Sequence, residues 1–396
     1  MEIKRVGKDE EAWLLRAYAF GQTPVTTAQI EEHRSAPDSD TVNLLAYEPI
    51  DGPEPEAVAV VGGIPLQQNV RGRVVPMLGV TGVASHPAAR RRGHVRTLLD
   101  RLHREMRDEG FVTAVLYPFR PTFYERFGYV GFPKARSIRL SPRGLRRTEL
   151  PGSVTLHRIG EEGALQTGWD YLQQRMQTRH GFALGSAERH RAADSADDHW
   201  VVYARDAAGS VVGMLQYRTG EFGDELRGRD FLASNPLGRM LLVQWLARHA
   251  DQYAWFSFEL PPDERPDLWD TDIIVEDRTR IESPTHSAPM GRVLSVPGLS
   301  GLRVQAAEPV TVEVVDDPLA GGTWTLDGTD PAGLQVYPGR SEPAATLTSH
   351  GLAGLVFGTL DPDEVELRGF GSVPAEAAEA LATLFPRAWP HVYSTF

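Results

Sequence analysis

The sequence predicts a mixed α/β protein of three domains, and three features of the chain support this. Residues 77–129 read as a strand, an Arg/Gly turn, an amphipathic helix and a second strand. The same order of elements returns in weaker form between residues 200 and 260. From about residue 290 the chain consists of short β-prone segments separated by Gly, Pro and Asp. A length of 396 residues fits two or three domains. The expected domains span residues 1–150, 151–288 and 289–396.

The first domain is expected to begin with a small set of strands before this central stretch. Asn69-Val70-Arg71-Gly72 can form the turn of a hairpin, because Asn and Gly tolerate a positive φ. The expected elements are a strand at 2–6, a helix at 10–20, a strand at 41–48, and hairpin strands at 57–67 and 73–85.

The central stretch has the strongest periodicity in the chain. Its first strand alternates and carries the β-branched residues Val80, Thr81 and Val83. A helical stripe then follows, and Gly110 ends it before a second strand at 111–117. The apolar positions of the stripe are Val95, Leu98, Leu99, Leu102 and Met106.

The turn between strand and helix, Arg90-Arg91-Arg92-Gly93, predicts an anion site. The first N–H groups of a helix have no partner within the helix, and the helix dipole favours negative charge there. Gly93 allows the backbone to approach a ligand closely, and arginines bind phosphate oxygens well. A solvated face is the alternative, but cations at a helix N-terminus are unfavourable unless an anion offsets them.

The second domain is expected to repeat this order without the arginines. It should contain a helix at 163–180, a hairpin at 200–205 and 211–218, a helix at 235–250 and a strand at 253–260. When Gly238 is aligned with Gly93, Asn235-Pro236-Leu237 replaces the three arginines, and Pro236 has no N–H for a phosphate. In the third domain the strand-like segments are residues 310–317, 322–328, 333–339 and 345–358, before a last helix at 374–384.

Composition narrows the function further. The chain has no cysteine, which excludes disulfides and thiolate catalysis, and it has no apolar run long enough to span a membrane. Neither G-x-S-x-G nor H-E-x-x-H occurs, which argues against a serine hydrolase or a zinc peptidase. A net charge of −12 disfavours nucleic-acid binding and suits a cationic substrate. Without a signal-peptide core at the N-terminus, we expect a cytoplasmic protein.

Two motifs resemble a known family. Arg90-x-x-Gly93-x-Val95 is similar to the R-x-x-G-x-(small) pattern of the acetyl-CoA site in GNAT N-acetyltransferases, although Val95 stands where Gly or Ala is usual. FYERFGYVGF at 123–132 resembles the segment in which these enzymes place a tyrosine beside the coenzyme A sulfur. With the total length and the aromatic last residue Phe396, the resemblance narrows to the Eis (enhanced intracellular survival) family, which acetylates amines of aminoglycosides.

This resemblance implies a catalytic GNAT domain, a degenerate GNAT-like domain that does not bind coenzyme A, and a sterol-carrier-like α+β domain whose C-terminus reaches the active site. It also implies the residues that hold acetyl-CoA. The pantetheine arm would lie along Val83, Ala84 and Ser85, and the pyrophosphate on Arg91, Arg92, Gly93, His94, Val95 and Arg96. Phe119 and Arg120 match positions that close over the coenzyme, although small or acidic residues are expected there.

The proposed catalytic groups also come from the resemblance. Tyr124 matches the general acid; spacing alone would allow Tyr129 as well, and a packed aromatic residue is the structural alternative. The free carboxylate of Phe396 matches the general base, whereas chain ends are usually frayed. Neither role needs a metal. Residues 190–199, with two histidines and three aspartates, are interpreted as an acidic loop, and His94 and His103 are expected on the exposed side of the helix.

The sequence therefore predicts an acetyl-CoA-dependent N-acetyltransferase that acts on a small-molecule amine by direct attack and that forms a homo-oligomer, a hexamer by resemblance. One alternative is a non-catalytic protein that binds coenzyme A as a sensor, with the third domain as a lipid-binding or partner-binding module. Another is an acetyltransferase whose acceptor is a protein lysine or a polyamine. Amine-dependent release of free thiol separates the enzyme from the sensor.

Overall fold

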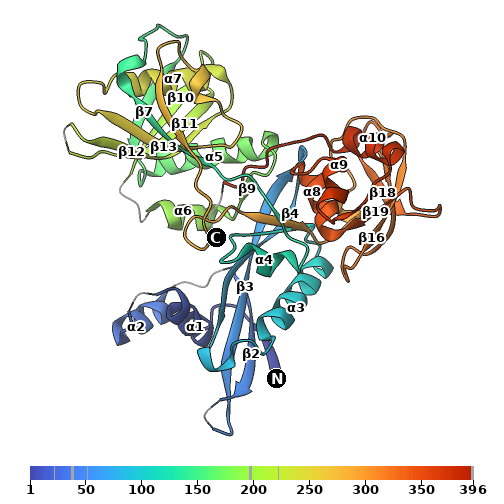
Figure 1. Cartoon of the computed structure of the whole chain (residues 1–396). Helices are drawn as coiled ribbons and strands as arrows, with labels where there is room; N and C mark the ends of the chain where they lie inside the picture. The colour runs from blue at the N-terminus through green and yellow to red at the C-terminus, as the bar shows by residue number, and fades with distance from the viewer. Residues whose placement is uncertain (22, 37–39, 51, 196–198, 222, 394–396) are drawn as a thin grey trace.

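The computed structural model describes residues 1–396 except 22, 37–39, 51, 196–198, 222 and 394–396. Within this part the chain forms three β-sheets, each with its own helices, and the three bodies meet around the long hairpin of the first sheet (Figure 1). The mixed α/β class with several domains, predicted from the sequence, is confirmed. None of the helices in the described ranges has the length and apolar character that a membrane span requires.

The first sheet has eight strands, in the order β1-β2-β3-β4-β5-β15-β6 with β9 on β3. Its strands are β1 (Glu2–Val6), β2 (Val42–Pro49), β3 (Pro55–Val70), β4 (Arg73–Ser85), β5 (Thr113–Leu116), β6 (Val130–Gly131), β9 (Ala183–Leu184) and β15 (Met290–Val293). Four helices belong to it: α1 (Glu10–Phe20), α2 (Thr27–Ser35), α3 (His94–Asp108) and α4 (Pro121–Glu125). β1 to β4 are antiparallel, whereas β5 runs parallel to β4 because α3 connects them.

Helices α1 and α3 cover opposite faces of this sheet. Successive side chains of β3 alternate between the two, since Val60 packs under α1 while Val61 packs under α3. Four of the five apolar residues of the predicted α3 stripe, among them Leu98 and Leu102, are buried, and Val95 is half-buried. Burying a leucine side chain contributes about 2 kcal/mol, so this stripe fixes α3 firmly on the sheet.

The second sheet has seven strands, in the order β14-β7-β13-β12-β11-β10-β8. Its strands are β7 (Arg136–Ser141), β8 (Ser153–Arg158), β10 (Trp200–Arg205), β11 (Val211–Arg218), β12 (Glu225–Ala233), β13 (Trp255–Leu260) and β14 (Ile274–Arg278), with helices α5 (Glu162–Thr178), α6 (Ala187–Ser195) and α7 (Pro236–Ala247). Antiparallel β10, β11 and β12 lead through α7 into β13, which is parallel to β12. The second sheet therefore repeats the β4–α3–β5 unit of the first. The sequence predicted the repeat, but the strand in the place of β4 is β12, which was not among the expected strands.

The third sheet, β18-β17-β16-β19-β20, carries three helices. Its elements are β16 (Val310–Val315), β17 (Gly322–Asp327), β18 (Gln335–Pro338), β19 (Ala345–Thr348), β20 (Gly371–Ser372), α8 (Ser349–Phe357), α9 (Pro362–Leu367) and α10 (Ala375–Leu384). The expectation of one strand at 345–358 is wrong in its second part, because β19 ends at Thr348 and helix α8 follows. The Thr348 hydroxyl accepts the N–H of Gly351 and caps α8, whose apolar residues are buried.

Three short strands pair with a sheet other than that of their expected domain. β9 falls within 151–288 but pairs with β3 of the first sheet. β7 precedes residue 150 but pairs with β13 and β14 of the second sheet. β15 follows residue 288 but pairs with β5 and β6 of the first sheet. In the described residues the chain therefore crosses between the first two sheets four times, before β7, before β9, before β10 and before β15. The boundaries at 150 and 288 stay a prediction, although sheet membership and sequence order differ at these three strands.

The tip of the β3–β4 hairpin joins all three bodies to the C-terminal segment. The guanidinium group of Arg71 donates to the carbonyls of Leu355, Val356 and Pro386, near the end of α8. The Nδ1 atom of His180 accepts the N–H of Arg71, and the carbonyl of His180 accepts the N–H of His391. Through these bonds the segment after α10 returns to the junction of the first two sheets, as Figure 1 shows.

Candidate active site

The parallel pair β4–β5 opens at one point of the first sheet. The two strands pair from Met77 with Thr113 to Val80 with Leu116, and pairing then stops. β4 nevertheless continues to Ser85, held on its other side by β3. Along residues 81–85, β4 therefore presents a backbone edge that β5 does not cover, which is a place where an extended ligand can bind by sheet-like hydrogen bonds.

A β-bulge lies within this open edge. Three steps along β4, from Thr81 to Ala84, stand opposite two steps along β3, from Gly62 to Val60. Gly82 has a φ of 56°, and neither it nor Val83 has a partner in the register. Bulges of this kind re-aim the backbone next to functional sites. Of the residues expected to bind pantetheine, Ala84 is buried beneath α1, while Val83 and Ser85 are half-buried.

The N-terminus of α3 has the features that a backbone anion site requires. Its N-cap, Gly93, has a φ of 90° and makes no side-chain cap hydrogen bond, so the N–H groups of His94, Val95 and Arg96 have no intrahelical partner. A Cβ at Gly93 would meet nothing within 4 Å, so the space in front of the helix is open. Arg91, at a φ of 65°, adds a second left-handed residue to the turn. Such turns point successive N–H groups into one concavity that suits an anion.

The arginines around this terminus differ from one another. Arg92 Nη1 lies 2.9 Å from Glu48 Oε1 on β2, so its charge is already partly offset. Arg91 and Arg96 are exposed and have no carboxylate within 4 Å in the described ranges, which leaves them available for phosphate. The expectation that His94 is exposed is wrong. It is 7% exposed, with Nε2 2.9 Å from Glu48 Oε2.

The equivalent helix of the second sheet is closed. Asn235 caps α7 by accepting the N–H of Gly238, and Pro236 at the first turn offers no N–H. A Cβ at Gly238 would lie 2.0 Å from the carbonyl oxygen of Val212, so the helix packs directly on β11 at this point. These features support the inference from sequence that the second unit does not bind a coenzyme there.

The aromatic segment after β5 surrounds Tyr124. Phe119, which is 47% exposed, contacts the rings of Phe123 and Tyr124 at 5.2 and 5.6 Å between centroids, and Arg120 is the N-cap of α4. Tyr124 itself is 3% exposed, and burial raises the pKa of its hydroxyl above the ordinary value. The hydroxyl therefore stays protonated at neutral pH. It makes no hydrogen bond to the residues that the structure describes.

Tyr129, the alternative general acid, is committed to a structural network. Its hydroxyl and His103 Nε2 are 2.8 Å apart, and both residues are buried, so the expectation of an exposed His103 is wrong. Burial and the charge of Arg292 lower the pKa of His103 well below the ordinary value. Arg292 pairs with Asp317 at 2.8 Å and donates to the carbonyl of Phe127, which ties this network to the third sheet. The geometry therefore favours Tyr124.

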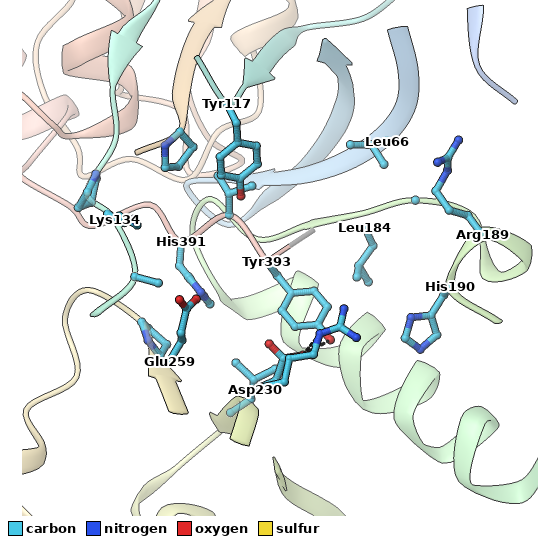
Figure 2. A pocket seen from close by; sticks show the side chains of 18 of the residues that line it. Leu66, Tyr117, Lys134, Leu184, Arg189, His190, Asp230, Glu259, His391 and Tyr393 are labelled. Atoms are coloured by element: carbon cyan, nitrogen blue, oxygen red, sulfur yellow. Dashed lines mark hydrogen bonds and ion pairs between the residues drawn. The ribbon is translucent and has the colours of Figure 1, made fainter. Parts of the chain in front are cut away.

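A cavity of about 560 Å³ lies between the first and second sheets. Tyr117, the residue directly after the last β4–β5 pair, forms part of its wall, so the cavity begins where β4 and β5 separate. Figure 2 shows Tyr117, Glu259, Asp230 and Tyr393 around the same space. Burial raises the pKa of Glu259, and burial, together with the charge of Glu259, raises the pKa of Tyr117.

The charged side chains of the cavity wall differ in whether they have hydrogen-bond or ion-pair partners. Lys134 Nζ donates to the carbonyls of Arg280 and His286, each at 2.9 Å, and Arg189 forms an ion pair with Asp40. Glu259 has no hydrogen bond or ion pair with the residues described here. Lys134 keeps its charge, because it donates only to neutral carbonyls, and this charge opposes the effect of burial on the pKa of Glu259. A cationic group that entered this cavity would meet a carboxylate that makes no hydrogen bond to the residues described here.

The C-terminal segment runs along the wall of the same cavity. The ring of Tyr393 stacks on Phe182 at 4.9 Å, and its hydroxyl donates to Asp230 Oδ2 at 3.2 Å. Gly181 makes room for the segment, since a Cβ there would lie 2.5 Å from the backbone nitrogen of His391. The predicted base, Phe396, lies outside the described residues. Three residues of chain reach at most about 10 Å beyond Tyr393.

Sequence reasoning missed the cavity residues. Glu259 and Asp230 come from β13 and β12, whereas Tyr117 follows β5, so only the tertiary structure brings them together. The one sequence signal was Glu259 itself, a charged residue within the apolar strand FSFEL. The expected acidic loop at 190–199 is also wrong in part: α6 extends to Ser195, with the hydroxyl of Ser186 accepting the N–H of Arg189, while residues 196–198 lie outside the described part.

Comparison with known proteins agrees with this geometry. Residues 3–131 match the model of the acetyltransferase (GNAT) domain, so the part of the first sheet from β1 to β6, with helices α1 to α4, forms a GNAT domain. The chain is 39% identical over 79 residues to the N-acetyltransferase Eis of Mycobacterium tuberculosis and of Mycobacterium bovis. This match covers 20% of the chain and 20% of each of these curated relatives, about a fifth of their length.

Solved structures extend the similarity in fold to the whole chain. A probable N-acyltransferase from Enterococcus faecalis has a TM-score of 0.82 at 18% identity, covering 100% of this chain and 99% of that one. A GCN5-related N-acetyltransferase from Anabaena variabilis has a TM-score of 0.81 at 17% identity, with 99% of both chains covered. Eis1 from Mycobacterium abscessus has a TM-score of 0.78 at 18% identity and covers 100% of both. The chain therefore contains a GNAT domain, and it is similar to Eis proteins in sequence over a fifth of its length and in fold over all of it, in agreement with the resemblance seen in the sequence.

Proposed function

We propose that the protein is an acetyl-CoA-dependent N-acetyltransferase whose acceptor is a small molecule with at least one amine. One observation carries this proposal: the β4–β5 pair ends at Val80 and Leu116, between an uncapped helix N-terminus and a cavity that begins at Tyr117. A thioester donor on one side and an amine on the other would meet at this point. Such proximity is a large part of what acyl transfer requires.

The donor side fits acetyl-CoA. The pantetheine arm would form sheet-like bonds to the open edge of β4 at Val83, Ala84 and Ser85, where β5 no longer competes. The pyrophosphate would bind the N–H groups at Gly93, His94, Val95 and Arg96, with Arg91 and Arg92 adding charge. Phe119 and Arg120 lie beyond the opening, and an exposed aromatic ring there can cover the bound donor.

The acceptor side fits an amine. Glu259 would hold an ammonium group in the cavity, because its carboxylate makes no hydrogen bond or ion pair with the described residues and is acted on by the charge of Lys134 only from beyond ion-pair distance. Acetyl transfer to aminoglycosides is the finer proposal, supported by the Eis resemblance and by the net charge of −12, which attracts polycations. Glu259→Gln should raise KM for the amine about tenfold and leave KM for acetyl-CoA unchanged, since the amide keeps the shape but loses the charge.

The chemistry would proceed by direct attack. The amine nitrogen forms a bond to the thioester carbon, the C–S bond breaks, and no acyl-enzyme forms. Tyr124 would give its proton to the departing thiolate, which suits a hydroxyl that burial keeps protonated. The carboxylate of Phe396 would take the proton from the amine, supported by the position of Tyr393 three residues earlier in the cavity wall. No step of this scheme needs a metal.

The resemblance also supports a homo-oligomer, specifically a hexamer, and a cytoplasmic location. Two rivals to the enzymatic role are a coenzyme A sensor and an acetyltransferase for protein lysines or polyamines. The deciding experiment incubates the full chain with acetyl-CoA and a panel containing an aminoglycoside, spermidine and a lysine peptide. Free thiol and acceptor mass are followed together. We expect thiol release that depends on an amine and an acetylated product, whereas tight acetyl-CoA binding without either would favour the sensor.

A further inference from the structure

Arg16 lies on the inner side of α1, against the bulge of β4. Its Nε atom donates to the carbonyl of Gly82 at 3.2 Å, and its Nη2 atom donates to Oδ1 of Asn43. No carboxylate lies within 4 Å of the guanidinium group in the part of the chain that the structure describes. The positive charge of Arg16 is therefore largely desolvated and is balanced only by neutral oxygens.

Two glycines make the space for this guanidinium group. A Cβ at Gly62 on β3 would lie 2.4 Å from Arg16 Nη2, and a Cβ at Gly82 on β4 would lie 2.1 Å from Arg16 Nε. Any larger residue at either position would displace the side chain. Asn43 is oriented in turn, since it is 3% exposed and its Nδ2 atom donates to the carbonyl of Gly7 at 2.5 Å. The position of Arg16 is therefore built by three strands and a loop.

The bond to Gly82 acts on a single peptide group. The carbonyl of Gly82 and the N–H of Val83 belong to the same planar unit, so a bond that fixes one also fixes the other. A cation at the carbonyl oxygen polarises the unit and makes the N–H a stronger donor. Neither residue has a partner in the β3–β4 register, and β5 does not pair with β4 beyond Val80, so no paired residue of either strand stands opposite this N–H where a ligand would bind beside β5.

We infer that Arg16 is a positioning residue for acetyl transfer: it holds and polarises the Gly82–Val83 peptide so that the Val83 N–H donates to the thioester oxygen as negative charge develops there. The inference rests on the proposed function. Removing a donor to such an oxyanion typically lowers kcat about 10²- to 10³-fold. Because Arg16 acts through a peptide that remains in Arg16→Gln, we expect a smaller loss, about tenfold.

The test uses Arg16→Gln, Arg16→Lys and a matched control, Arg73→Gln. Arg73 is also on β4 and donates to a backbone carbonyl, that of Gly298 at 2.9 Å, but it lies at the far end of the strand. Arg16→Gln should lower kcat about tenfold while the Kd for coenzyme A, which has no acetyl group, changes less than twofold. Arg16→Lys keeps a charge and should lie between Arg16→Gln and wild type, and Arg73→Gln should match wild type.

A spectroscopic readout separates this inference from the proposed function. Acetyl-CoA labelled with ¹³C at the thioester carbonyl is bound without an amine, and its stretching band is measured by difference infrared spectroscopy. The band should move to lower frequency in wild type and Arg73→Gln, and less in Arg16→Gln. An equal shift in wild type and Arg16→Gln would overturn the role of Arg16, as would a loss of coenzyme A affinity that parallels the loss of kcat. If no amine is acetylated, the proposed function fails whatever the band does.

Discussion

The two tyrosines of the aromatic segment should respond to the same substitution in opposite ways. In Tyr124→Phe the lost hydroxyl has no hydrogen bond to the described residues, so we expect little change in stability. If Tyr124 is the general acid, kcat should fall about 100-fold. In Tyr129→Phe the lost hydroxyl leaves His103 Nε2 buried without its partner at 2.8 Å. That should cost about 1–3 kcal/mol of unfolding free energy and leave kcat within a few-fold of wild type.

Thermal melting checks the expected changes in stability, and steady-state thiol release from the same preparations checks the expected changes in kcat. A loss of about 2 kcal/mol corresponds to a Tm decrease of several degrees for a domain of about 200 residues. Acetyl-CoA should be saturating, so that a change in KM cannot pass for a change in kcat. If Tyr124→Phe turns over within a few-fold of wild type, Tyr124 has no catalytic role. If Tyr129→Phe loses activity but not stability, the assignment of the two residues is reversed.

Three further predictions concern the α3 terminus, the chain end and the junction of the sheets at His180. Replacing Arg91 and Arg92 together by Ala should raise KM for acetyl-CoA about tenfold, because the α3 terminus would keep its N–H groups but lose both charges. As the control, Arg239→Ala at the closed α7 terminus should leave KM for acetyl-CoA unchanged. A C-terminal tag or deletion of Phe396 should abolish most transfer without weakening acetyl-CoA binding, since the first removes the carboxylate and the second displaces it by about 3.5 Å; full activity in the tagged protein would exclude the terminal base. Burial lowers the pKa of His180 to about 4, so the unfolded chain takes up this proton first as the pH falls from about 6.5. Between pH 7 and pH 5 this proton uptake should lower the free energy of unfolding by about 2 kcal/mol, as measured by denaturant titration. The variant His180→Gln should lose that part of the pH dependence. A pH dependence identical to that of wild type would contradict the assignment to His180.

The parts of the fold with strong local patterns could be predicted from the sequence. The apolar stripe of α3 and the Asn69-to-Gly72 turn of the β3–β4 hairpin specify their structures locally, and both occur as expected. Helix α2 was missed because it buries no side chain and so has no apolar stripe. Its only sequence signal is the capping box formed by Thr26 and Gln29, which the structure contains.

The candidate site also has parts that a local sequence motif could indicate and parts that depend on the tertiary structure. The anion site at Gly93 depends on one turn and one helix, so a local motif could indicate it. The burial of His103 depends on Tyr129 and on Arg292 from a strand nearly two hundred residues away, and helical periodicity alone placed it on the wrong side. The cavity proposed for the acceptor draws on both sheets and on the C-terminal segment, so no single stretch of sequence could reveal it.

The most direct test of this account is a crystal structure of the full chain with a bisubstrate conjugate, an aminoglycoside amine joined through an acetyl linker to the coenzyme A sulfur. The account predicts pantetheine along residues 81–85 of β4, pyrophosphate at the N-terminus of α3, and the aminoglycoside in the cavity between Tyr117 and Glu259. A conjugate whose coenzyme lies elsewhere, or whose aminoglycoside lies outside that cavity, would contradict the claim that the two form one active site.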